Sequence, residues 1–133
     1  MKAVIFSLFL CSVCCLNGYT QQHSSAYKNL IGTWSINDST GELPSISFKF
    51  KDSTHVILTV AYEGNAHLTY TLDAMHDPMI LHFKGINADK KKMDTYWLLK
   101  ILNNDTIKAE EPLYSLKDDQ WNDYEAITMV RAR

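Results

Sequence analysis

Strict alternation of apolar and polar residues is the feature that most limits what this chain can fold into. Ile46, Phe48 and Phe50 are separated by single serine or lysine residues, so all three share one face of an extended strand. A period of two suits an antiparallel strand with one buried face, because successive side chains point to opposite sides. Asp52 stands where the next apolar residue was due, and it predicts a turn over 52–54.

Similar short segments recur along the rest of the chain, separated by turn signals such as Glu63-Gly64-Asn65 and Asn103-Asn104-Asp105. Their number and spacing predict one all-β domain, an antiparallel meander barrel or a sandwich of about eight strands. A short plug over 24–30 is expected before the first strand. The expected strands cover 31–36, 45–51, 55–62, 67–72, 79–84, 95–102, 106–110 and 124–132.

The first residues predict a cleaved signal peptide over 1–20. Lys2 gives a short basic start, an apolar run over 3–16 follows, and polar residues begin at Asn17. The run is too short to span a bilayer, which takes about 20 apolar residues. We therefore expect an exported protein, secreted or periplasmic, whose barrel domain occupies 21–133 and has no transmembrane segment.

The cysteines and the charge balance exclude several classes of protein. Cys11, Cys14 and Cys15 all lie within the leader, so the remaining chain has no cysteine for a disulfide. Lipid attachment at Cys14 or Cys15 is an alternative that the preceding residues do not favour, because they lack a Leu-x-small pattern. Without Lys2 the chain has 12 basic and 15 acidic residues, a net charge of −3. No basic surface for nucleic acid is expected.

Three segments resemble the lipocalin-like proteins, and most closely the short, exported ones of Bacteroidetes-type bacteria. The first is Leu-x-Gly-x-Trp at 30–34, the second the aromatic strand and its turn at 96–107, and the third the closing strand at 127–131. The resemblance implies an antiparallel barrel of about eight strands, of the calycin type. The chain is shorter than a typical lipocalin, no C-terminal helix follows the barrel, and no second family motif is evident.

The resemblance also implies how the barrel is closed. Trp34 would pack across the closed end, Gly32 would allow a close approach of the chain there, and Arg131 would lie over the indole ring. An arginine over an indole face is a favourable cation–π pair. Arg133 is the competing choice for the cation.

The expected interior is rich in large apolar side chains, which leaves two functions open. An eight-stranded barrel is just wide enough either to be filled by side chains or to hold one small ligand. The first alternative is therefore a binder of a small hydrophobic or amphipathic molecule. The second is a filled barrel that binds a protein partner through its outer surface or its 111–123 loop. The candidate ligand contacts on the interior or rim are Phe48, Phe50, Leu58, Tyr70, Trp97, Tyr114 and Trp121.

The strand over 95–102 leaves one choice of phase open, because a shift by one residue would exchange Tyr96 for Trp97 on the inner face.

No nucleophile elbow, glycine-rich phosphate loop or zinc-protease helix is present. The five histidines lack the spacing of a metal site. We therefore expect no catalytic residues, no metal ligands and no cofactor.

Overall fold

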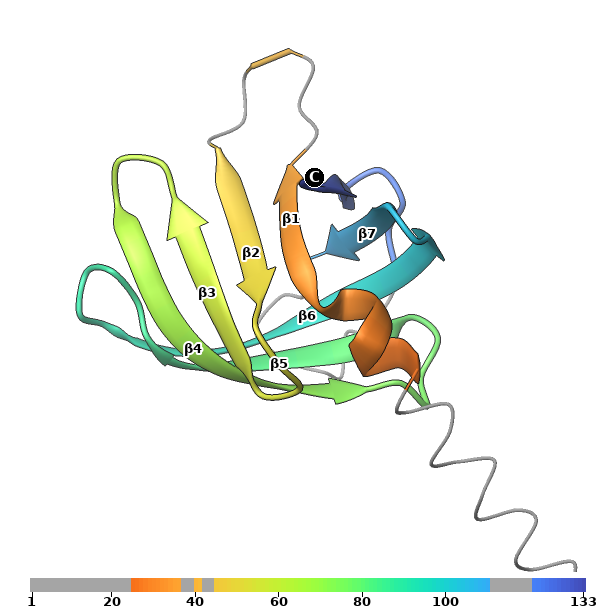
Figure 1. Cartoon of the computed structure of the whole chain (residues 1–133), viewed down its shortest axis with the longest axis horizontal. Helices are drawn as coiled ribbons and strands as arrows, with labels where there is room; N and C mark the ends of the chain where they lie inside the picture. The colour runs from red at the N-terminus through yellow and green to blue at the C-terminus, as the bar shows by residue number, and fades with distance from the viewer. Residues whose placement is uncertain (1–24, 37–39, 42–44, 111–120) are drawn as a thin grey trace, which may run out of the picture.

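The computed structural model shows eight antiparallel strands, in chain order, that close into one barrel (Figure 1). Each strand pairs with the next, and the last pairs back with the first. This confirms the all-β meander barrel predicted from the sequence. The strands are β1 (Gly32–Ile36), β2 (Ile46–Phe50), β3 (His55–Val60), β4 (Gly64–Asp73), β5 (Met79–Ile86), β6 (Lys92–Asn103), β7 (Thr106–Glu110) and β8 (Ile127–Arg131).

The structure describes residues 25–36, 40–41, 45–110 and 121–133. The predicted signal peptide over 1–20, the lipidation alternative at Cys14 or Cys15 and the ligand candidate Tyr114 all lie outside these ranges. Within them, no helix is long and apolar enough to cross a membrane.

The strand register confirms which face of each strand points inward. Phe48 lies opposite both Trp34 and Leu58, and Tyr70 lies opposite Phe83, so these positions share the inner wall. The same alternation continues around the closed sheet, with one irregularity between β6 and β7, where the register shifts between Ile101 and Asn103. The apolar half of each alternating segment is therefore the half that the barrel encloses.

The register also settles the phase of β6. Trp97 lies opposite Leu81 on the inner wall, and Tyr96 points outward. The outward ring of Tyr96 stacks on His82, with the two ring centroids 4.0 Å apart. Nε2 of His82 lies 2.7 Å from a carboxylate oxygen of Asp94, so the outer wall here carries a small polar cluster.

An aromatic cluster occupies the middle of the barrel. Its five rings have neighbouring centroids between 5.0 and 6.5 Å apart, in stacked, tilted and edge-to-face arrangements. The members, called the aromatic cluster from here on, are Phe48, Phe50, Tyr70, Phe83 and Trp97. These buried rings fill this level of the barrel with side chains.

Two turns illustrate where local sequence signals held and where they failed. The Asp52 carboxylate accepts the backbone N–H groups of Thr54 and His55 at 2.7 and 2.8 Å, which confirms the turn expected there. These hydrogen bonds favour the charged carboxylate and hold the pKa of Asp52 well below its usual range. By contrast, the turn expected over 63–65 is wrong: the chain turns over 61–63.

The displaced turn has a physical cause in the pairing of β3 with β4. Gly64 lies opposite Val60, and Asn65 lies opposite Thr59 and accepts a hydrogen bond from its hydroxyl at 2.7 Å. Pairing these residues moves the turn toward the N-terminus, where Tyr62 adopts a left-handed φ of 70°. Other strand boundaries also differ from expectation. β6 begins at Lys92, β5 extends to Ile86, and β8 covers 127–131.

Candidate ligand-binding site

One end of the barrel is sealed by a helix over residues 25–30, within the plug expected from the sequence (Figure 1). Leu30 at its end is completely buried. The Tyr27 hydroxyl accepts a hydrogen bond from the Leu72 N–H at 2.9 Å, which ties the helix to β4. We call this side the closed end.

Trp34 and Arg131 form the centre of the closed end. The Trp34 ring is completely buried, and its indole N–H donates to the Leu30 carbonyl at 2.8 Å. The Arg131 guanidinium carbon lies 4.2 Å from the centre of this ring, within cation–π range. Its N–H groups donate to the carbonyls of Ile31, Asn29 and Asn104 at 2.6, 2.7 and 2.8 Å. Arg131 therefore joins the last strand to the helix, to the start of β1 and to the β6–β7 turn.

Glycine at position 32 is required by this arrangement. Gly32 has a φ of 131°, and a Cβ placed on it would lie 2.5 Å from Nη1 of Arg131. The competing cation, Arg133, is 91% exposed, and its guanidinium lies 3.8 Å from a carboxylate oxygen of Asp105. The Trp–Arg pair that the resemblance implies is thus the one between Trp34 and Arg131.

The opposite end of the inner wall is apolar but partly open to solvent. Below this level most inward side chains are buried, although Met79 and Ile101 near the closed end are partly exposed, whereas at this end the inward positions on five strands are only partly buried. Figure 1 shows that the β3–β4 and β5–β6 hairpins lie at the end away from the helix. We call the partly exposed set the apolar mouth; it comprises Ile36, Ile46, Leu58, Val60, Met93 and Ile127.

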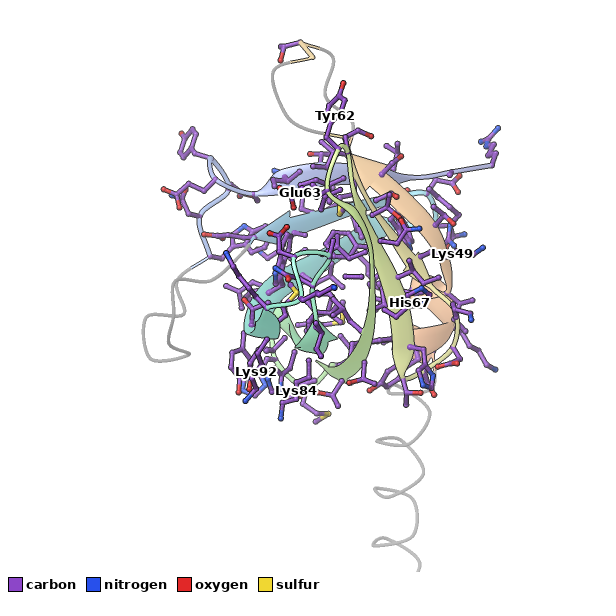
Figure 2. The ribbon with its side chains drawn as sticks, turned by 90° about the vertical axis from the view of Figure 1, so that its left-hand side faces the viewer. Lys49, Tyr62, Glu63, His67, Lys84 and Lys92 are labelled. Carbon is purple, nitrogen blue, oxygen red and sulfur yellow. The ribbon has the colours of Figure 1, made fainter. Side chains whose placement is uncertain are left out.

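Exposed polar side chains lie outside the mouth on the side of the β3–β4 and β5–β6 hairpins. Figure 2 views the molecule from the side of the β5–β6 hairpin, and its labelled side chains project away from the barrel interior. Tyr62 and Glu63 stand at the tip of the β3–β4 hairpin, and Lys84 and Lys92 lie on β5 and β6, all exposed.

The inner wall contains few polar side chains, and most of those already have partners. The Tyr70 hydroxyl donates to the Asp52 carbonyl at 2.7 Å, and burial raises the pKa of Tyr70 above its usual value. Trp34 and Arg131 donate to backbone carbonyls at the closed end, as described above. In contrast, the indole N–H of Trp97 is buried and has no hydrogen-bond partner among the residues that the structure describes. Such a buried, unpaired donor costs about 1–3 kcal/mol.

Residues 121–123 lie on the outer wall and not in the interior. Nζ of Lys100, an outward residue of β6, lies 4.5 Å from the centre of the Trp121 ring. Asp123 accepts hydrogen bonds from the Trp121 indole and from Lys108, which hold its pKa below the usual value. The Asn122 N–H also donates to the buried Glu110 carboxylate at 2.8 Å. Trp121 therefore packs against the outside of the barrel.

The predicted ligand contacts thus separate into three places. Leu58 lies in the apolar mouth, Trp121 lies on the outer wall, and the remaining described candidates belong to the aromatic cluster. The sequence analysis assigned none of the other five mouth residues to a site; these are Ile36, Ile46, Val60, Met93 and Ile127. The signal for Ile46 was present in the alternation of β2, and the signal for Met93 was its even spacing from Trp97.

Comparison with known proteins adds no family to this geometry. No family model, no curated protein and no solved structure matches the chain. Within the described ranges, no three histidine, cysteine, aspartate or glutamate residues gather closely enough to hold a metal ion. The apolar mouth is therefore the candidate site that the structure itself offers.

Proposed function

We propose that this barrel binds a small hydrophobic or amphipathic molecule at its apolar mouth, as a lipocalin-like binding protein. The observation that carries the proposal is the asymmetry of the inner wall. Most apolar side chains at the closed end are buried, Met79 and Ile101 being partly exposed, whereas the six apolar side chains of the mouth are all partly exposed. Partly exposed apolar side chains that gather at one place beside polar ones are typical of binding sites.

The aromatic cluster sets the depth that a ligand can reach. Phe48 lies directly below Ile46 on β2, and its ring is 5.6 Å from Phe83 and 5.3 Å from Trp97, centre to centre. A ligand would therefore rest on these rings, with its sides against the mouth. Binding would come mainly from apolar burial, worth about 25 cal/mol per Å². The proposal includes export of the protein, as its leader predicts, and assigns it no catalytic step.

The proposal is tested with N-phenyl-1-naphthylamine, a neutral probe whose fluorescence rises in apolar surroundings. The full chain without its leader is titrated with the probe. The Leu58→Trp variant places a larger side chain in the mouth, and we expect it to weaken probe binding at least about tenfold, or about 1.4 kcal/mol. Native mass spectrometry of protein purified from its own host would then identify a retained molecule.

The matched control is Ile57→Trp, one residue earlier on the same strand. Ile57 lies opposite Lys49 and His67 on the outer wall, so its substitution leaves the mouth unchanged. Figure 2 shows Lys49 and His67 on the outside of the barrel. Equal losses in both variants, or a wild-type protein that does not bind the probe, would reject the proposal. The second result would favour a filled barrel that acts through its outer surface.

A further inference from the structure

The strongest unexplained feature of the inner wall is the unpaired indole N–H of Trp97. The atom is buried, and the whole residue is 8% exposed. Buried polar groups in proteins are nearly always hydrogen-bonded, so an orphaned donor needs an explanation. The other indole on the inner wall, that of Trp34, has a backbone partner at 2.8 Å. The contrast marks Trp97 as a donor whose partner is not supplied by the described chain.

Trp97 is the first buried inward residue of β6 below the mouth. Along the inner face of this strand, Met93 and Thr95 are partly exposed, Trp97 and Leu99 are buried, and Ile101 toward the closed end is again partly exposed. The Trp97 ring also contacts Phe48, which lies opposite the mouth residue Leu58. A ligand that rests on the aromatic cluster would therefore come close to the Trp97 ring.

Charge on the inner wall restricts what such a ligand can be. Among the inward positions that the structure describes, the charged residue is Arg131, and its N–H groups are taken by three carbonyls at the closed end. A carboxylate buried in the mouth would thus lack a cationic partner, and burying an unpaired charge is expensive. A neutral oxygen would meet no such penalty.

We propose that the ligand is a neutral, largely apolar molecule whose inward end carries a single hydrogen-bond acceptor, such as a ketone, ester or aldehyde oxygen, and that the Trp97 indole N–H donates to it. The inference rests on the proposed function and specifies its ligand class. Thr95, on the same face of β6, provides a hydroxyl nearer the mouth for a second polar atom. The bond would pair the orphaned donor that the protein otherwise leaves buried.

The test compares two ligands of the same shape, 2-decanone and 2-methyl-1-decene, which differ by a carbonyl oxygen in place of a methylene group. Each displaces N-phenyl-1-naphthylamine from the wild-type protein and from Trp97→Phe. In the variant, the ratio of the alkene Kd to the ketone Kd should fall about 2- to 10-fold. This fall corresponds to the loss of the free energy that one neutral hydrogen bond contributes. Trp121→Phe, on the outer wall, is the matched control and should leave the ratio unchanged.

A second measurement needs only the wild-type fold. In ¹⁵N-labelled protein, the indole N–H signal of Trp97 is identified by its loss in Trp97→Phe. Saturation with the ketone should move its proton downfield, whereas saturation with the alkene should not. Decanoate at pH 8 should bind at least about tenfold more weakly than the ketone, because an unpaired buried charge costs more than one hydrogen bond gains.

The outcomes separate the two proposals. If the wild-type protein does not bind the probe, the binding function fails and this inference fails with it. If the probe binds but neither ligand displaces it, the binding function stands and the inferred ligand class is rejected. If both ligands bind but the ratio is the same in wild type and Trp97→Phe, or both move the indole signal equally, the role of Trp97 is rejected while binding stands. Decanoate binding as tight as the ketone would reject the neutral class.

Discussion

Replacing Arg131 is the sharpest test of how this barrel is held closed. The guanidinium carbon lies 4.2 Å from the centre of the buried Trp34 ring, and three N–H···O bonds of 2.6 to 2.8 Å tie it to backbone carbonyls. A cation–π contact is worth about 0.5–2 kcal/mol, and a hydrogen bond from a charged group about 1.5–3 kcal/mol. The Arg131 side chain is 24% exposed, so in the variant water can hydrogen-bond some of the groups that Arg131 contacts, and the net loss of stability is smaller than the sum of these contributions.

With that discount, Arg131→Ala should lower the free energy of unfolding by about 3 kcal/mol. Arg131→Lys should lose about 2 kcal/mol, because an ammonium keeps the charge but cannot reach three carbonyls at once. The measurement is urea unfolding followed by far-UV circular dichroism and tryptophan fluorescence. Arg133→Ala is the control; its side chain is 91% exposed, and its loss should stay below about 0.5 kcal/mol. A loss below 1 kcal/mol for Arg131→Ala, or losses that match between the two alanine variants, would refute this account of closure.

Three further outcomes follow from the same geometry. Gly32→Ala should cost more than about 1 kcal/mol, because its Cβ would meet Nη1 of Arg131, and the cost should shrink in an Arg131→Ala background; urea unfolding of both backgrounds checks this. Phe83→Ala should cost about 3–5 kcal/mol by opening a cavity in the aromatic cluster, measured the same way. The pKa of Asp52 is lowered on folding, so its carboxylate stabilises the protein above the unfolded pKa, near 3.8, and this contribution disappears as the pH falls further. Wild type should therefore lose more stability between pH 5 and pH 3 than Asp52→Asn does, in urea midpoints taken at each pH.

The fold was predictable because its signals are local. Alternation in segments such as Ile46–Phe50 fixes which side chains share a face. That prediction stays correct even when the predicted ends of the strand are wrong by a few residues. The turn after β3 was placed too late because glycine and asparagine can occupy a strand as well as a turn when partners are present. Here Val60 and Thr59 provide those partners, and cross-strand pairing outweighed the local preference.

The candidate site was only half predictable, because it depends on properties of the closed barrel. Inward direction follows from alternation, but whether an inward residue is sealed or exposed depends on where the helix sits. Leu30 and Leu58 are both apolar, yet one is completely buried at the closed end and the other lies partly exposed at the mouth. The outer position of Trp121 and the unpaired donor of Trp97 depend on neighbours distant in sequence, which no local pattern specifies.

The long sequence separation between Arg131 and its hydrogen-bond partners affects how the chain folds. Its hydrogen bonds to Ile31 and Asn29 span 100 and 102 residues of sequence, and β1 pairs with β8 across a similar distance. Contacts between such distant segments carry a large loop-closure entropy, so they form slowly and late. Until β8 is in place, one edge of β1 and one edge of β7 lack strand partners, and open edges invite pairing with other chains. The interval before seam closure is therefore when this protein is most prone to aggregation.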